Sequence, residues 1–280
     1  MTLPAEHSAG PSSELAPDDS SFDISDEADV GALLAAEESH FWHRARNRFI
    51  RGKIADLGKK PPARVLELGC GAGCVSSDLA RAGYDVIGID GHRSLLAVAC
   101  TRAPQARFFC HDLRRGLPDL ERGSFDVVAL FDVIEHLDDP LRALSDAASL
   151  AKPGGYVVGT VPALMSLWSS IDEHAGHKIR YSQQTLAETL AGVRGAHVTE
   201  IAPFFRSLVP LVWLQRRMLG RAGRTDRSEH VAASVQNLRV PPLPINAGLL
   251  AMANAEHALA RAVPRLSLPG ASLWFALARA

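Results

Sequence analysis

Long apolar runs are absent from this chain of 280 residues. Its apolar stretches, such as residues 207–214, are far shorter than the ~20 residues that a bilayer-crossing helix needs. The N-terminus also lacks the basic start and apolar core of a secretion signal. The sequence therefore predicts no transmembrane helix and a cytoplasmic location. Any contact of the protein with a membrane would be peripheral and at its cytoplasmic face.

Cysteine is scarce. The four cysteines are Cys70, Cys74, Cys100 and Cys110. Cys70 and Cys74 are separated by three intervening residues and have no matching second pair, so neither a disulfide framework nor a cysteine zinc site is expected.

Basic residues are missing from the first 43 positions, where ten acidic residues give a charge of −10. The remaining residues carry +9, and Lys occurs at only five positions in the chain. The net charge of −1 is thus a cancellation between an acidic leader and a mildly basic body. An excess this small and scattered argues against nucleic-acid binding.

The N-terminal region divides into two parts. Residues 1–25 are rich in Ser, Pro, Asp and Glu, which predicts a disordered leader. Apolar residues at helical spacing then predict a helix from Glu27 to Leu57, within an N-terminal helical cap (26–60) that Gly58 and Pro61-Pro62 end.

Strand and helix patterns alternate along the body and predict an α/β, doubly wound, Rossmann-like sheet. Strands are expected at Arg64–Leu68, Asp85–Ile89, Arg107–Cys110, Asp126–Phe131, Gly155–Val161, His197–Phe204 and Ser272–Leu277. Helices between them are expected at Ser76–Ala82, Arg93–Ala103, Pro140–Leu150 and Gln184–Leu190. The core is assigned to residues 61–205 and 270–280, with a helical insertion at 206–269 that holds helices near Leu208–Leu219 and Ala247–Ala262.

The first strand ends in a glycine-rich turn with Gly69, Gly71 and Gly73. Glycines here allow a sharp turn and a close approach of backbone to ligand at a helix start. The dinucleotide fingerprint needs its third glycine at position 74, which is Cys74, so a nicotinamide enzyme is disfavoured. Glu67, two residues before the turn, suits a ligand with positive charge.

Acidic residues follow the next strands. Asp90 ends the second strand and can accept hydrogen bonds from both hydroxyls of a ribose, while Asp112 after the third could accept one from an adenine amino group. The fourth strand runs into Phe131-Asp132-Val133-Ile134-Glu135-His136-Leu137, and Lys152-Pro153-Gly154-Gly155-Tyr156 precedes the fifth.

Together these motifs resemble the class I S-adenosylmethionine-dependent methyltransferases over residues 64–162, and most closely their ubiquinone-pathway, small-molecule branch. The resemblance implies a seven-stranded sheet with an antiparallel last strand, and S-adenosylmethionine as cofactor. It places the glycines at the methionine portion, Asp90 at the ribose, Asp112 at the adenine and Asp132 at the amino-acid end. The cofactor site it implies consists of Glu67, Gly69, Cys70, Gly71, Gly73, Asp90, Gly91, Asp112, Leu113 and Asp132.

Two histidines are candidates for the catalytic base. Unperturbed imidazole titrates near neutrality, so His136 or His177 could take a proton from a hydroxyl as the methyl arrives. A helix-start or core histidine bonded to backbone is the alternative for His136. His174 and His177 could share a helix face, but no third clear ligand accompanies them and no metal is expected.

Acceptor contacts are expected from two regions. Trp168, Arg180 and Tyr181 belong to the loop after the fifth strand, at the edge where ligands bind in such sheets. Trp42 and Arg46 lie four apart on the first helix and either cap the cleft or pack against the sheet. The insertion places arginines, from Arg206 to Arg227, beside apolar residues, which fits a lid, a membrane-surface segment or an ordinary solvated helix face.

The sequence thus predicts an enzyme that transfers a methyl group to a small or lipid-like acceptor, with oxygen as the preferred atom. Transfer to carbon or nitrogen stays open. The alternative is a non-catalytic S-adenosylmethionine-binding protein that acts as a partner or sensor.

Overall fold

The computed structural model describes residues 34, 37–219, 240–262 and 268–280 of the chain. The strands are β1 (Arg64–Leu68), β2 (Asp85–Asp90), β3 (Arg107–Cys110), β4 (Phe125–Phe131), β5 (Ala151–Pro162), β6 (Ala196–Phe204) and β7 (Ser272–Arg279). They form one seven-stranded sheet in the order β3-β2-β1-β4-β5-β7-β6. Because β7 runs antiparallel to both of its neighbours, the expected α/β fold with an antiparallel last strand is confirmed.

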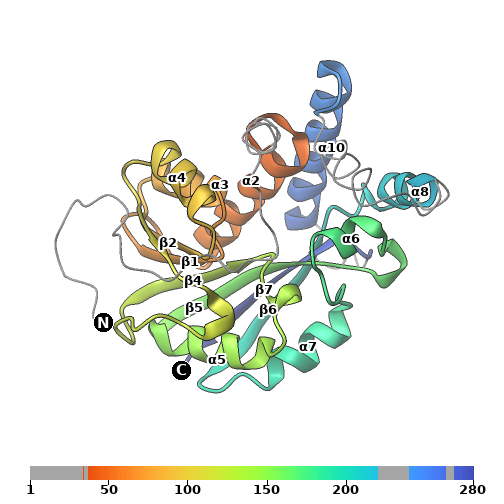
Figure 1. The fold of residues 1–280 in the computed structure, drawn as a ribbon. Coiled ribbons are helices and arrows are strands. Elements are labelled where there is room, and N and C mark those ends of the chain that lie inside the picture. Colours follow the sequence, from red (N-terminus) through yellow and green to blue (C-terminus); the bar gives the residue numbers. More distant parts are fainter. Residues whose placement is uncertain (1–33, 35–36, 220–239, 263–267) are drawn as a thin grey trace.

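Helices cover both faces of this sheet (Figure 1). They are α2 (Phe41–Asp56), α3 (Cys74–Arg81), α4 (Arg93–Arg102), α5 (Pro140–Leu150), α6 (Ser170–His174), α7 (Gln183–Ala191), α8 (Val209–Leu219) and α10 (Leu243–Ala262). Short 3₁₀ turns occur at η1 (Leu113–Arg115), η2 (Ile134–His136) and η3 (Met165–Leu167). No described helix is both long and apolar enough to cross a membrane.

The sheet separates two apolar cores. On one face, α2 and α3 pack over side chains such as Val127 and Trp274. On the other, α5 and α7 cover Val128 and Phe275. Successive side chains of a strand point to opposite faces of the sheet. Because both faces are covered here, the parallel strands carry apolar residues on both sides, which explains their near-continuous hydrophobic runs.

The first helix differs from its expected bounds. The structure starts α2 at Phe41, because His40 has extended backbone (φ −70°, ψ 132°) and its Nδ1 accepts the Trp42 amide as an N-cap. Gly58 at φ 76° follows the helix end, as expected. The predicted leader (1–25) lies outside the described residues.

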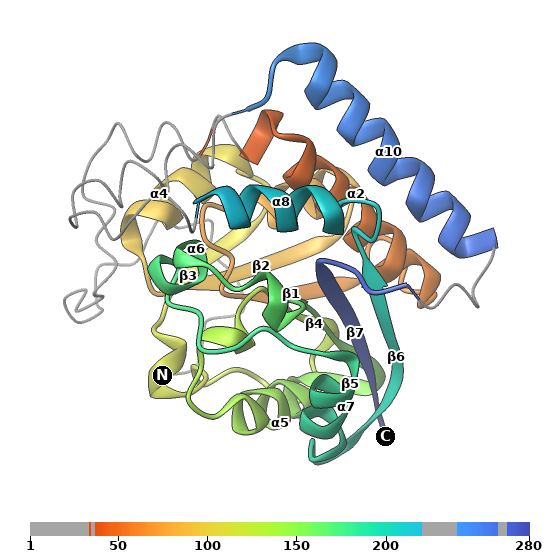
Figure 2. The same ribbon diagram turned by 90° about the vertical axis from the view of Figure 1, so that its right-hand side faces the viewer.

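The insertion contributes α8 and α10, which extend the helical layer on the α2 side (Figure 2). α10 packs along α2. Its buried Asn246 accepts the Phe41 amide at 2.8 Å and donates to the Ser39 carbonyl at 2.8 Å. A residue some 200 positions away therefore fixes the start of the first helix. Arginines 221, 224 and 227 of the insertion lie outside the described residues.

Candidate cofactor and acceptor site

The glycine turn connects β1 to α3 at the carboxyl edge of the sheet. Gly69, Gly71 and Gly73 have φ values of 75°, 53° and 72°, a region that L side chains rarely adopt. A Cβ on Gly69 would lie 2.5 Å from Val133, so only glycine fits there. A Cβ on Gly71 would meet nothing within 4 Å, so space is open beside the turn. The Cys70 amide donates to the Ile89 carbonyl at 3.0 Å and fixes the turn to β2.

Two buried carboxylates lie under this turn. Asp90 accepts the Gly71 amide at 2.8 Å and the His92 amide at 2.9 Å. Glu67, 2% exposed, accepts a hydrogen bond from the Ser76 hydroxyl. Burial raises the pKa of Glu67 to about 7, against the opposing effect of the Ser76 bond.

Asp112 stands after β3 as the N-cap of η1, with Leu113 as the first residue of that turn. Its carboxylate accepts from the Arg114 side chain at 2.9 Å, and this bond lowers the pKa of Asp112. A Cβ on Gly91 would lie 3.7 Å from the Asp112 Cα, so the segments after β2 and β3 are adjacent. The structure thus brings the predicted adenine and ribose residues to one edge.

Asp132 follows β4 with φ 54°, an uncommon conformation for a non-glycine residue. Thr160 donates to it at 3.0 Å, and the Arg46 guanidinium lies 2.6 Å from its other oxygen. Arg46 therefore reaches from α2 to the end of a central strand. Trp42, one turn earlier, instead packs against Phe205 with ring centroids 4.1 Å apart, at the start of the insertion.

The two candidate bases lie together. The His136 and His177 ring centroids are 4.9 Å apart. His136 Nδ1 is 3.3 Å from the Gly176 carbonyl, and His177 Nδ1 is 2.9 Å from an Asp172 carboxylate oxygen. Since both partners are acceptors, each Nδ1 carries a proton, and Nε2 is the nitrogen that offers a lone pair in the neutral form of each ring. Burial, and then the neighbouring His177, lower the pKa of His136.

Asp172 is the centre of a buried ion-pair cluster that the sequence did not single out. Besides His177, it bonds Arg180 Nε at 2.7 Å and the Arg216 guanidinium at 2.5 Å. Burial raises the pKa of Asp172, but these partners hold it well below its usual range. The cluster joins α8 to the loop after β5. That loop contains α6, a helix that the sequence analysis did not predict, and a capping box of Ser169 and Asp172 starts it.

The remaining predicted acceptor residues occupy different environments. Arg180 is 5% exposed and also donates to the Ala163 carbonyl at 2.9 Å. Tyr181 is buried in the core under the sheet, and Trp168 donates to Glu173 at 3.3 Å. Arg180 and Tyr181 thus face the protein interior, whereas Trp168 lies nearer the surface.

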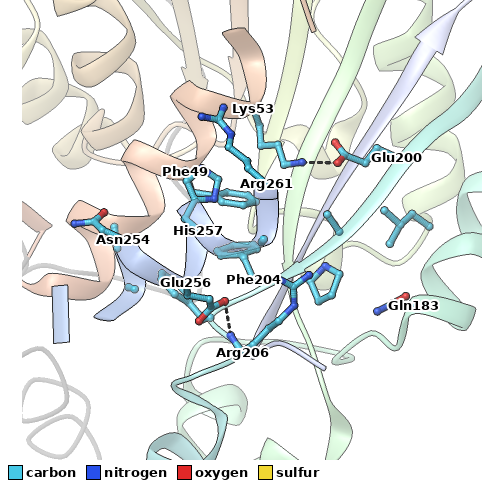
Figure 3. A pocket seen from close by; sticks show the side chains of 17 residues that line it. Phe49, Lys53, Gln183, Glu200, Phe204, Arg206, Asn254, Glu256, His257 and Arg261 are labelled. Carbon is cyan, nitrogen blue, oxygen red and sulfur yellow. Dashed lines mark hydrogen bonds and ion pairs between the residues drawn. The ribbon is translucent and has the colours of Figure 1, made fainter. Parts of the chain in front are cut away.

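A hollow of about 420 Å³ lies between α2, β6 and α10 (Figure 3). Phe49 and Phe204 line it and stack on each other with ring centroids 4.3 Å apart, and His257 meets Phe49 edge-on at 4.8 Å. Lys53 and Glu200 form an ion pair at its rim. It does not include the glycine turn.

A family model described as a methyltransferase domain matches residues 41–206, from the start of α2 past the end of β6. The chain belongs to this methyltransferase family. More than half of the chain is matched, so the resemblance to the class I S-adenosylmethionine-dependent methyltransferases is confirmed, with S-adenosylmethionine as the cofactor.

Several known proteins are similar to this methyltransferase. A ubiquinone biosynthesis O-methyltransferase of Coxiella burnetii is 35% identical over 120 residues, which are 41% of this chain and 49% of that protein. The protein of the same name from Ralstonia nicotianae is 40% identical over 97 residues, 34% and 41% of the two chains. This chain therefore spans about half the length of the curated relatives it matches.

Solved structures share its fold. A Haloferax volcanii methyltransferase complex with the activator Trm112 aligns with a TM-score of 0.57 at 17% identity, over 92% of this chain and 99% of that one. The phosphoethanolamine N-methyltransferase 2 of Haemonchus contortus, solved with S-adenosyl-L-methionine, aligns with a TM-score of 0.57 at 20% identity. The alignment covers 90% of this chain and 57% of that chain. At these identities the likeness concerns the fold alone.

The described residues fit the cofactor. Space is open beside Gly71, and the buried carboxylates of Glu67 and Asp90 suit cationic and hydroxyl groups. Arg46 Nε is buried and has no hydrogen-bond partner among the described residues, so this N–H of the guanidinium can still be donated to a carboxylate ligand.

Proposed function

We propose that this methyltransferase transfers the methyl group to a hydroxyl oxygen of a small or lipid-like acceptor. The observation that carries the proposal is the imidazole pair of His136 and His177, whose ring centroids are 4.9 Å apart. His136 follows Asp132 by four residues in the sequence. When bound, S-adenosylmethionine supplies an electrophilic methyl on a sulfonium. The names of the curated relatives, which are O-methyltransferases, support oxygen as the acceptor atom.

The cofactor residues hold complementary parts of one ligand in this proposal. The glycine turn, with Cys70, lies against the methionine portion, Asp90 and Gly91 against the ribose, and Asp112 and Leu113 against the adenine. Glu67 supports the turn from below. Asp132 lies near the amino-acid end.

In this proposal Arg46 contacts the cofactor, whereas the sequence predicted an acceptor contact. Its guanidinium lies on Asp132, and its Nε has no partner among the described residues. We assign it to the carboxylate of the cofactor, since guanidinium and carboxylate match in charge and geometry. α2 then acts as a cap over the cofactor.

The acceptor hydroxyl lies at the imidazole pair in this proposal. Fixed Nδ1–H bonds leave both Nε2 lone pairs available to draw the hydroxyl proton as the methyl is transferred. Alignment of the oxygen with the methyl supplies the rest of the rate enhancement, because in-line displacement depends on geometry. Trp168 contacts the acceptor, whereas the buried Arg180 and Tyr181 position the loop that carries His177.

A lipid-like acceptor agrees with the surface of the insertion. Leu211, Trp213 and Leu214 on α8 are 45%, 44% and 51% exposed, and Leu243 on α10 is 83% exposed. Apolar side chains beside Arg217 of α8 favour contact with an anionic membrane surface. The aromatic hollow of Figure 3 offers room for an apolar tail. Nucleic acid has no part in the proposal, which keeps a cytoplasmic location.

The proposal is tested with methyl-labelled S-adenosylmethionine and a panel of phenols, catechols and their prenylated forms. We expect labelled product with at least one of them, and a loss of turnover of about 100-fold or more in His136→Ala and His177→Ala. His197→Ala, an exposed histidine on β6, is the matched control. S-adenosylhomocysteine binding without transfer to any acceptor would favour the non-catalytic alternative, and turnover unchanged in both variants would exclude the imidazole pair.

A further inference from the structure

Three potential metal ligands meet just beyond β4. Glu135, His136 and His177 each offer one donor atom, and these atoms all lie within 4.8 Å of one another. Ligands about 2.0–2.1 Å from one tetrahedral zinc are about 3.3 Å apart, so small side-chain rotations close the set. Two imidazoles and one carboxylate form a ligand set found in catalytic zinc sites.

Glu135 is a buried carboxylate without a partner. Its exposed fraction is 0%, and neither carboxylate oxygen has a hydrogen-bond partner among the described residues. The two nearby cations form their ion pairs with other carboxylates, Arg46 with Asp132 and Arg180 with Asp172, and neither is hydrogen-bonded to Glu135. A buried charge is costly unless it is paired or coordinates a metal, so Glu135 either holds a proton or binds a cation.

The outer contacts of the two imidazoles are those of metal ligands. Metal-bound histidines usually donate the other ring N–H to a carboxylate or a backbone carbonyl, which fixes the tautomer and ring orientation. His177 donates to Asp172 and His136 to the Gly176 carbonyl. Arg180 and Arg216 bond to Asp172 in turn and hold the carboxylate that orients His177.

We propose that Glu135, His136 and His177 bind one divalent transition-metal ion of the Zn²⁺ class, with a fourth position open toward the acceptor. The orphaned carboxylate supplies the negative charge, and the two Nε2 lone pairs supply nitrogen ligands. The sequence predicted no metal, because His174 and His177 on one helix face lack a third ligand and the contribution of Glu135 depends on the fold.

This ion deepens the proposed function and rests on it for its role. The acceptor hydroxyl binds at the open position, where a divalent ion lowers the pKa of a coordinated O–H group. Its proton leaves to water, the oxygen attacks the methyl carbon, and the carbon–sulfur bond breaks as the oxygen–carbon bond forms. The imidazoles then act as ligands and not as free bases.

Metal binding is tested first without any acceptor. Purified full-length protein, stripped with a chelator, is titrated with Zn²⁺ by calorimetry and with Co²⁺ by absorption spectroscopy. We expect one ion per chain, d–d bands of a low-symmetry Co²⁺ site and no thiolate charge-transfer band, which excludes binding by Cys70 or Cys74. Glu135→Gln, His136→Ala and His177→Ala should each weaken affinity at least about tenfold, and His197→Ala should leave it unchanged.

Circular dichroism and S-adenosylhomocysteine binding show whether each variant is folded. Absence of stoichiometric binding by the folded wild type, or equal affinity in folded Glu135→Gln and wild type, would overturn the site. In that case His136 and His177 serve only to hold the loop through their hydrogen bonds, and Glu135 is protonated.

Turnover of the stripped enzyme separates this inference from the proposed function. Methyl transfer that vanishes on stripping and returns with Zn²⁺ or Co²⁺ supports both. Transfer that persists in the stripped enzyme keeps the O-methyltransferase and overturns the catalytic ion. Metal binding without transfer to any hydroxyl keeps the ion site and contradicts its role and the proposed function.

Discussion

Glu67 is a carboxylate that the fold keeps from water. Burial raises its pKa to about 7 from an ordinary 4.5, so the folded protein binds this proton more tightly than the unfolded chain does. The stabilisation is fully present below pH 4.5 and is lost as the pH rises through 7. A shift of this size corresponds to about 3 kcal/mol.

Glu67→Gln should therefore flatten the pH dependence of stability. In the cofactor-free wild type, the free energy of unfolding should fall by up to about 3 kcal/mol more than in the variant between these two pH values. Urea unfolding across that range checks this, with the exposed Glu188→Gln as control. If the free energy of unfolding changed with pH in the same way in wild type and Glu67→Gln, the raised pKa of Glu67 would be contradicted.

Gly69 has the positive φ and the close neighbour that exclude a side chain. Gly69→Ala should lower the free energy of unfolding by more than the about 1–2 kcal/mol of left-handed strain alone, because its Cβ meets Val133. Gly195→Ala is the matched control, since Gly195 has φ 77° and nothing within 4 Å of the added Cβ. Denaturation and S-adenosylhomocysteine calorimetry measure both effects. Equal losses in the two variants would show that the clash is relieved.

Among the elements, α2 reaches the carboxyl edge of the sheet through the ion pair of Arg46 with Asp132. Arg46→Ala should weaken S-adenosylhomocysteine binding at least about tenfold, because it leaves Asp132 unpaired and removes the cation assigned to the cofactor carboxylate. Arg48→Ala changes an exposed arginine on the same helix and should have little effect. Calorimetry on folded variants decides, and unchanged affinity for Arg46→Ala would remove α2 from the cofactor site.

The apolar surface of α8 leads to a second prediction about an element. Wild type should sediment with anionic vesicles at low salt, and less at high salt, since arginines accompany the apolar residues. The double variant Trp213→Ala/Leu214→Ala should lose most of this binding. Val198→Ala, an exposed apolar residue on β6, is the control. No salt-sensitive sedimentation of the wild type would refute the membrane contact.

For the whole molecule, local sequence patterns predicted the elements well and their long-range partners poorly. Every expected strand occurs, because apolar periodicity and glycine turns act within a few residues. Asn246 and Asp172 escaped prediction, because their roles depend on which distant segments the fold brings to them. Glu135 was visible beside His136, but its lack of a partner is a property of the folded interior alone.

The cofactor edge was predictable for a related reason. Parallel strands end at one edge, so residues after successive strands converge whatever the details of packing. Arg46 could be placed on a helix but not on Asp132, since the direction of α2 depends on its contacts with α10.

The central claim is methyl transfer to oxygen. The most direct test incubates the full-length protein with S-adenosylmethionine carrying a ¹³C-labelled methyl and the acceptor panel, and reads the product by carbon NMR. We expect a resonance of a methyl bonded to oxygen, together with an equal amount of S-adenosylhomocysteine. A methyl bonded to carbon or nitrogen, or cofactor binding with no product, would contradict it.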